Sequence, residues 1–196
     1  MLPEIEYREN PKLSADHIEE AANLAYLAFE DFYGLFSGDR FKVVSIIADQ
    51  LTNFSELSQH LVCFKSNKVV GFCSFYKIPE MSQRQMAGIL GLFSVASDIT
   101  ESTKVLNQYR KHFAAPTGDG IYISRFVIDM HLRGSGLAAE LLSNAELIFE
   151  RNRAKQVRLH VRKQNEQALG FYAKAGYEPL ENQDLGYTLF GKDLVR

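Results

Sequence analysis

In parts of the chain apolar and polar residues alternate, which is typical of strands. Elsewhere apolar residues recur about every 3.6 residues, which is typical of helices. The alternation in EIEYRE (4–9) predicts a short strand. Ser14 is a candidate N-cap for one helix that extends through Phe32, because apolar residues follow it at helical spacing. A second helix is predicted over FKVVSIIADQLTNF (41–54), after the polar break SGD (37–39).

The middle of the chain predicts a β-hairpin followed by a helical insert. Two β-rich runs in HLVCFKSNKVVGFCSFYKI (60–78) are separated by the pair Ser66-Asn67, which favours a tight turn. Residues 79–119 interrupt this strand pattern and regain helical spacing. We therefore expect a helical insert of two helices before the next strand.

Strands and helices alternate in the rest of the chain. IYISRFVI (121–128) is apolar at nearly every position, which is typical of a strand buried on both faces. The elements expected after it are a helix ending near Arg151, a strand over QVRLHVRK (156–163), a short helix ended by Gly176, and a strand over LGYTLFGKDL (185–194). The order predicts an α/β (α+β) fold, a mixed sheet with helices on both faces.

The bulk composition is that of an ordinary globular protein. The chain has 196 residues, 46% of them hydrophobic, and 22 basic against 24 acidic residues give a net charge of −2. We expect one domain (1–196) and no nucleic-acid or membrane partner, because the charge is balanced and the longest apolar run, GILGLFSVA (88–96), is too short to span a bilayer. A cytoplasmic location is the default expectation, and the sequence leaves a homodimer open.

The two cysteines indicate neither a disulfide framework nor a metal site. Cys63 and Cys73 lie in the apolar runs of the predicted hairpin, and the chain has no second cysteine pair at metal-binding spacing. We expect two reduced, buried thiols and no bound metal.

A glycine-rich segment, HLRGSGLAAELL (131–142), joins the buried strand to the next helix. Free N–H groups and the positive end of the helix dipole make such a position an anion site, and glycine lets a phosphate approach the backbone closely. Arg133 adds a cation beside Gly134 and Gly136. Three interpretations are open: a dinucleotide site, a site for the diphosphate of an acyl-CoA, and a tight turn without a ligand.

The dinucleotide interpretation, an NADP-dependent oxidoreductase, is the weakest of the three. GSGLAA (134–139) fits the G-x-G-x-x-A fingerprint, but that fingerprint requires the strand to run straight into the first glycine. Here DMHLR (129–133) intervenes, and the following strand ends in VRKQ (161–164) without a carboxylate for the ribose.

Two spaced motifs favour the acyl-CoA interpretation. Arg133 to Ala138 has the form R-x-x-G-x-A, and residues 165–177 have the form N-x-x-A-x-x-x-Y-x-K-x-G-[FY]. In this order around a strand, the motifs resemble the GNAT superfamily of acyl-CoA-dependent N-acyltransferases. The resemblance implies a mostly antiparallel, twisted sheet of about seven strands, with the fourth and fifth strands splayed apart and the insert (79–119) between the third and fourth strands.

The resemblance also implies positions for acetyl-CoA. The pantetheine arm is expected along the backbone of the fourth strand, where an N–H group also polarises the thioester carbonyl. The diphosphate is expected on the amides after Arg133. Asn165 is expected to contact the cofactor or to hold the loop in place, and it can cap its helix at the same time. The implied cofactor-binding residues are Phe126, Val127, Ile128, Arg133, Gly134, Ser135, Gly136, Leu137, Ala138, Asn165 and Tyr172.

The implied reaction is the direct attack of a neutral amine on the thioester. Tyr172 stands where the family carries its general acid, and a phenol with a pKa of about 10 can protonate a thiolate whose thiol has a pKa of roughly 8.5 to 9. The alternative for Tyr172 is a core aromatic residue. The fourth strand offers Tyr122, Ser124 and Arg125 but no glutamate or histidine, so it does not identify the base.

The acceptor is the least defined part of the prediction. Glu30, Asp31 and Tyr33 lie in the segment that walls the acceptor site in relatives and could hold a cationic substrate, although a solvated helix end is the favoured explanation for them. His131 and His160 receive no role.

The leading hypothesis is an N-acetyltransferase acting on a primary amine of a small molecule or peptide. An acyl-CoA-binding regulatory module without turnover is the alternative, and the insert covers either the acceptor pocket or a neighbouring subunit.

Overall fold

The computed structural model describes residues 4–111, 115–181 and 186–194, and one seven-stranded sheet forms its centre. The strand order is β1-β2-β3-β4-β5-β7-β6, and every neighbouring pair is antiparallel except β4 and β5, which are parallel. The strands are β1 (Ile5–Glu9), β2 (His60–Lys65), β3 (Lys68–Lys77), β4 (Ile121–Ile128), β5 (Gln156–Arg162), β6 (Glu178–Glu181) and β7 (Tyr187–Asp193). The predicted mixed, mostly antiparallel sheet is confirmed.

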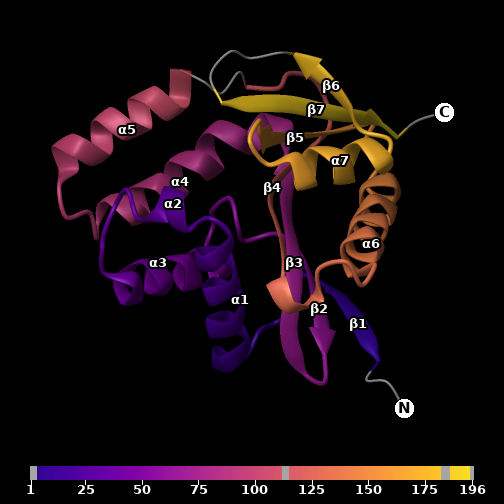
Figure 1. Cartoon of the computed structure of the whole chain (residues 1–196), viewed down its shortest axis with the longest axis horizontal. Helices are drawn as coiled ribbons and strands as arrows, with labels where there is room; N and C mark the ends of the chain where they lie inside the picture. The colour runs from indigo at the N-terminus through magenta and orange to yellow at the C-terminus, as the bar shows by residue number, and fades with distance from the viewer. Residues whose placement is uncertain (1–3, 112–114, 182–185, 195–196) are drawn as a thin grey trace.

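Helices cover both faces of this sheet. Figure 1 shows α1 to α5 on one side of the strands and α6 and α7 on the other. The helices are α1 (Ala15–Ala28), α2 (Glu30–Tyr33), α3 (Arg40–Thr52), α4 (Met81–Phe93), α5 (Ile99–Lys111), α6 (Leu137–Arg151) and α7 (Glu166–Lys174), with short 3-10 turns at Ile78–Glu80 and Met130–Leu132. The predicted insert between β3 and β4 thus contains α4 and α5, although its residues 112–114 lie outside the described residues, as does residue 185 of the predicted last strand.

Two local features differ from the sequence prediction. The first predicted helix is broken at Phe29, whose φ of −132° and ψ of 31° leave the helical region. The break turns Phe32 into the core and lays the Phe29 ring over the Arg125 guanidinium, 4.9 Å away. The short edge strand β6 was not apparent in the residue pattern, because it is only four residues long and contains Pro179.

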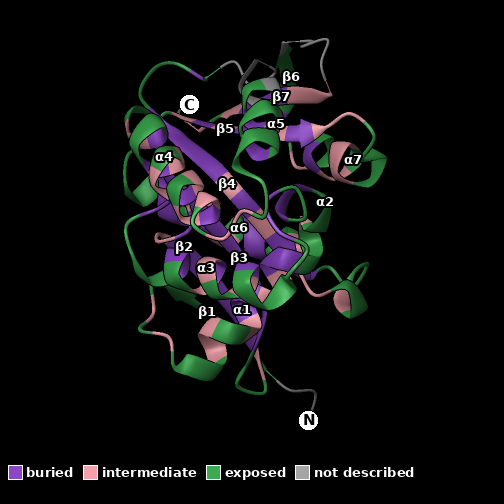
Figure 2. Cartoon of the chain, turned by 90° about the vertical axis from the view of Figure 1, so that its left-hand side faces the viewer, coloured by how far each residue is buried: buried purple, intermediate pink, exposed green. Residues whose placement is uncertain are grey.

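Side chains of the two faces form separate apolar cores. One core joins the strands to α6 and α7, and the other joins them to α1, α2 and α3. Figure 2 shows the buried residues concentrated along β3 and β4, between helices whose outer turns are exposed. Cys63 and Cys73 are buried free thiols, as predicted, and burial raises the pKa of the Cys63 thiol to about 11.

The hairpin of β2 and β3 fixes the position of β4. Ser66 and Asn67 have φ angles of 52° and 59°, which is the left-handed geometry of a two-residue hairpin turn. Gly71 of β3 faces Ile128 of β4, and a Cβ atom on Gly71 would lie 2.8 Å from the carbonyl oxygen of Val127. The close approach of the two strands at this point therefore requires glycine.

We predict that Gly71→Ala destabilises the fold by about 1–3 kcal/mol, because a backbone oxygen cannot move aside as a flexible side chain can. Gly38→Ala is the matched control, since a Cβ atom there meets nothing within 4 Å, and its free energy of unfolding should change by less than about 0.5 kcal/mol. Urea denaturation of both variants measures the difference. Equal stability of the two variants would show that β3 and β4 can separate without cost.

Candidate functional site

The strands β4 and β5 pair only at their beginnings and then diverge. Their register consists of Ile121 with Val157 and Tyr122 with Arg158, and no later pair joins them among the described residues. A cavity of about 640 Å³ lies in the resulting gap and is lined by both strands. The splayed strands implied by the resemblance are thus present, and the later backbone of β4 has an edge without a strand partner.

A β-bulge in β4 directs its side chains to opposite walls of the gap. Ser74 pairs with Arg125 and Phe75 with Ile123, so Ser124 is an extra residue in β4. The Ser124 hydroxyl donates a hydrogen bond to the Glu56 carbonyl oxygen at 2.6 Å, which holds the bulge against the loop after α3.

The bulge changes which residues of β4 share a face. Tyr122 and Arg125 both lie on the face covered by α1 to α5, although they are three positions apart, whereas Phe126 packs on the opposite side against Phe171 and Tyr172 of α7. Of the three residues predicted to hold the pantetheine arm, Phe126 lines the cavity. Val127 belongs to the core beside α1, and Ile128 packs against the core beside α6.

The glycine-rich loop links the end of β4 to α6. Gly134 and Gly136 have φ angles of 77° and 91°, and a Cβ atom at either would meet nothing within 4 Å, so the conformation and not crowding requires glycine there. The Ser135 amide donates to the Leu132 carbonyl oxygen and the Leu137 amide to the Ser135 hydroxyl. The amides of Gly134, Gly136 and Ala138 have no such acceptor among the described residues.

These amides form an exposed donor cluster at the start of a fifteen-residue helix. The cluster, with Arg133 beside it, has the chemistry of an anion site. The loop does not itself line the cavity within the described part of the chain.

The second motif places two residues at the cavity wall. Asn165 caps α7, since its side-chain oxygen accepts a hydrogen bond from the Ala168 amide at 3.1 Å, and it also lines the cavity. Tyr172 lines the cavity with only 6% of its surface exposed. Burial, and to a lesser extent the nearby Cys73, raises the pKa of Tyr172 well above its ordinary value. Its hydroxyl forms no hydrogen bond with another described residue.

Helices of the first half and of the insert form the opposite wall. Of the three residues predicted near the acceptor, Asp31 lines the cavity, Glu30 does not, and Tyr33 is fully buried in the core beside α1. Gln85 of α4 and Leu106 of α5 also line the cavity. The insert therefore forms part of the wall of a pocket in its own chain, and whether this pocket holds an acceptor stays a prediction.

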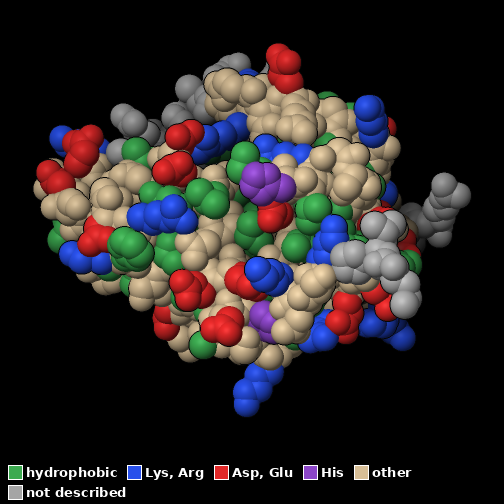
Figure 3. All heavy atoms as spheres, turned by 60° about the horizontal axis from the view of Figure 1, so that its bottom comes forward, with side chains coloured by type: hydrophobic (Ala, Val, Ile, Leu, Met, Phe, Trp, Pro, Cys, Tyr) green, Lys and Arg blue, Asp and Glu red, His purple; other side chains and the backbone are tan. Residues whose placement is uncertain are grey.

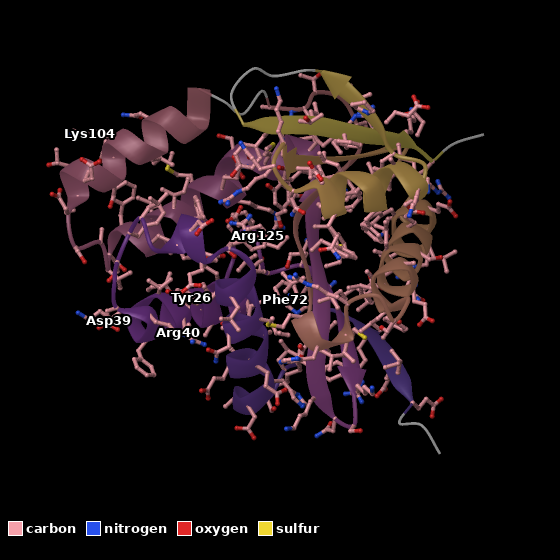
Figure 4. All side chains as sticks on the ribbon, viewed as in Figure 1. Tyr26, Asp39, Arg40, Phe72, Lys104 and Arg125 are labelled. Atoms are coloured by element: carbon pink, nitrogen blue, oxygen red, sulfur yellow. The ribbon has the colours of Figure 1, made fainter. Side chains whose placement is uncertain are left out.

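Two ion pairs join the strands to this wall. Arg125 donates to Glu56 at 2.9 Å, and their side chains are only 9% and 12% exposed, so the pair is buried; Figure 4 shows Arg125 in the interior between α2 and the strands. Arg162 of β5 pairs with Asp31 of α2 at 3.2 Å across the cavity. All four charged residues line the cavity, and their formal charges cancel.

A tyrosine–histidine pair connects the two strands where they begin to diverge. The Tyr122 hydroxyl and Nδ1 of His160 are 3.0 Å apart, and both side chains line the cavity. Burial lowers the pKa of His160 to about 4 and raises the pKa of Tyr122, so both are neutral at pH 7. The sequence prediction assigned His160 no role. The available signal was its alternation with Leu159 and Val161 on β5, which places it on the opposite face from the apolar core.

The outer surface has a mixed character. On the face in Figure 3, basic and acidic side chains are interspersed. No helix among the described residues is long and apolar enough to cross a membrane. The described residues also contain no group of three or more histidine, cysteine, aspartate or glutamate side chains placed to hold a metal ion.

Solved structures share this architecture over nearly the whole chain. An N-acetyltransferase from Staphylococcus aureus Mu50 has a TM-score of 0.67 and 20% identity, with 95% of this chain and 100% of that chain covered. PaiA N-acetyltransferase from Thermoplasma acidophilum, solved in complex with coenzyme A, has a TM-score of 0.57 and 18% identity, with 97% and 99% covered. At these identities the likeness concerns the fold alone.

The sequence itself supplies the family assignment. No curated protein sequence matches the chain significantly. The family model for the acetyltransferase (GNAT) family matches residues 23–177, which include the splayed strands, the glycine-rich loop and α7. The chain therefore belongs to the acetyltransferase (GNAT) family.

Proposed function

We propose that this chain, acting as a single domain over residues 1–196, transfers an acetyl group from acetyl-CoA to a primary amine. The observation that carries the proposal is the gap between β4 and β5, because it combines an unpaired strand edge, a buried tyrosine and a donor cluster at the end of the same strand. A solved neighbour of this fold, PaiA N-acetyltransferase, is in complex with coenzyme A.

The cofactor would lie along β4 with its diphosphate on the loop. The free edge of β4 at Phe126, Val127 and Ile128 offers N–H and C=O groups to the amides of a pantetheine arm, as a neighbouring strand would. The unbonded amides of the loop and the dipole of α6 would hold the diphosphate, and the Arg133 guanidinium would neutralise part of its charge. Asn165 contributes by capping α7 at the cavity wall.

In the proposed reaction, the amine nitrogen attacks the thioester carbonyl and the C–S bond breaks. A β4 N–H group would stabilise the oxyanion of the tetrahedral intermediate. The CoA thiolate leaves and takes the hydroxyl proton of Tyr172, which regains a proton from solvent. The raised pKa of Tyr172 keeps this hydroxyl protonated, and the same dry gap raises the basicity of the expelled thiolate.

A primary ammonium ion loses two protons over the reaction, one to solvent before its nitrogen attacks and one from the cationic nitrogen of the tetrahedral intermediate as the amide forms. We assign the second proton to the Tyr122–His160 pair, which lies where the strands separate and replaces the carboxylate that β4 lacks. The lowered pKa of His160 makes it a weak base but keeps its imidazole neutral at pH 7, so it can accept this more acidic proton directly or through a water molecule.

The diphosphate site is tested by Gly136→Asp against Gly136→Asn. Both side chains tolerate the left-handed conformation and enter open space, so the variants differ only in charge. Calorimetric titration with acetyl-CoA should show affinity lower by roughly tenfold or more in the Asp variant than in the Asn variant. Equal affinities would place the diphosphate elsewhere, and no acetyl-CoA binding by the unmodified protein would refute the proposed function.

The general acid is tested by Tyr172→Phe. Loss of the hydroxyl should lower turnover by about 100-fold or more and leave the Kd for acetyl-CoA nearly unchanged, because the aromatic packing is retained. Tyr177→Phe is the control, since Tyr177 packs against Tyr172 in the same core but does not line the cavity. Equal turnover of the two variants, measured by CoA release, would exclude the acid role.

The proton acceptor is tested by His160→Gln, with the exposed His131→Gln as control. Turnover should fall by about 100-fold in the first variant only. Acetyl-CoA binding without CoA release by the unmodified protein, over a broad panel of amines, would instead favour the regulatory-module alternative.

The pH dependence of stability gives His160 a second readout. Between its unfolded pKa of about 6.5 and its folded pKa of about 4, the unfolded chain binds a proton that the folded chain does not, so stability falls as pH is lowered through this window. Urea denaturation at pH 7 and pH 4 measures this decrease in the free energy of unfolding. In the His160→Gln variant the decrease should be smaller by roughly 2–3 kcal/mol. An unchanged pH dependence would mean that His160 is accessible to protons in the folded state.

A further inference from the structure

Arg162 is a cation at the cavity that is held firmly by one neighbour and loosely by another. Its Nε donates a hydrogen bond to the Tyr187 hydroxyl at 3.1 Å, which fixes the plane of the guanidinium. Its Nη1 donates to Asp31 at 3.2 Å, but the Asp31 side chain is 87% exposed. An ion pair this exposed contributes little, so water or another carboxylate can replace Asp31.

The other arginine of the cavity wall has a different environment. Arg125 forms its ion pair with Glu56 in the interior, and the rings of Phe29 and Phe32 lie 4.9 and 5.7 Å from its guanidinium carbon. Breaking this pair would leave a buried charge without compensation, which is costly. Arg162 is therefore the cavity cation whose partner is exchangeable, and among the described residues its Nη2 makes no hydrogen bond.

Strand geometry relates Arg162 to the reacting centre. His160 and Arg162 are two residues apart on β5 and share one face, so their Cα atoms are about 7 Å apart. In the proposed reaction, the acceptor amine lies at the Tyr122–His160 pair. Because this distance is short, one small molecule can place its amine at His160 and a second group, a few bonds away, at Arg162.

The walls limit the size of that molecule. Phe32 of α2, Ile89 of α4 and Leu106 of α5 all line the cavity on the acceptor side. They bound a space of about 640 Å³ that the pantetheine arm would share, and this volume suits a small molecule better than an extended polypeptide.

We propose that the acceptor is a small amine that also carries a carboxylate, and that Arg162 binds this carboxylate in place of Asp31. The inference rests on the proposed acetyl transfer and narrows its substrate class. A planar guanidinium already oriented by Tyr187 binds a carboxylate through two parallel hydrogen bonds, and the cancelled charges of the cavity suit an acceptor that is itself a zwitterion.

The test uses pairs of acceptors that differ by the carboxylate, with CoA release as the measurement. Suitable pairs are phenylalanine with phenethylamine, leucine with 3-methylbutylamine, and 4-aminobutyrate with propylamine. We expect kcat/KM to be at least tenfold higher for the carboxylate-bearing member of at least one pair. Equal or better turnover of all the simple amines, or acetylation of peptide N-termini in preference to every small molecule, would overturn the inference while retaining acetyl transfer.

Two variants test the role of each partner in the Arg162–Asp31 pair. Arg162→Gln should raise KM for the carboxylate-bearing acceptor by tenfold or more and leave KM for its simple amine unchanged. Arg158→Gln is the matched control, because Arg158 lies on the same face of β5 but outside the cavity lining. An equal change for both members of the pair would overturn the assignment.

The Asp31→Asn variant distinguishes this inference from the reverse arrangement, in which Asp31 binds the ammonium group of the acceptor. Removal of the competing carboxylate should lower KM for the carboxylate-bearing acceptor or leave it unchanged. A rise in KM for all amines alike would overturn the inference. If simple amines are acetylated but no carboxylate-bearing amine is, the inference fails alone; if acetyl-CoA does not bind, or if no amine is acetylated, the proposed function fails with it.

Discussion

The separation of β4 from β5 is the constraint on which the rest of this structure depends. Parallel strands normally satisfy each other's backbone groups along their length, and here they do so at only two residue pairs. The gap is kept open from both sides. Phe126 packs on Phe171 and Tyr172 toward α7, while Arg125 is held by Glu56 toward α2. A sheet that closed at this position would have to expel both contacts.

The buried pair of Arg125 and Glu56 is better understood as a positioning device than as a source of stability. The desolvation of two charges offsets much of their attraction, so such a pair contributes little net free energy when it is intact and a large cost when it is broken. That cost ties β4 to the loop after α3, and the Ser124 hydroxyl joins the same loop through the Glu56 carbonyl oxygen. The bulge and the ion pair therefore fix where β4 leaves β5.

Residue patterns predicted the elements well where burial follows a regular period. The hairpin, the insert helices and the elements β4, α6, β5, α7 and β7 all have one-sided or fully apolar patterns, and each was found near its expected position. The break at Phe29 and the strand β6 were missed because tertiary contacts, and not local periodicity, determine them.

The same distinction applies to the candidate site. Asn165, Tyr172 and the glycine-rich loop lie within contiguous motifs and were predicted with their residue numbers. Whether they bind the cofactor stays a prediction. Glu56 comes from the loop after α3, whereas His160 and Arg162 come from β5, and they line one cavity only because β4 bulges and β5 diverges. Neither event has a residue pattern of its own, so the roles proposed for His160 and Arg162 required the three-dimensional arrangement.

Burial in one gap acts in opposite directions on the two groups assigned to proton transfer. It raises the pKa of Tyr172 and lowers that of His160, because each is disfavoured in its charged form. The phenol therefore stays protonated and the imidazole stays neutral over the whole physiological range. An acid and a base that must act in one turnover need these states at the same pH. In the proposed reaction, the structural feature that admits the cofactor thus also prepares both protonation states.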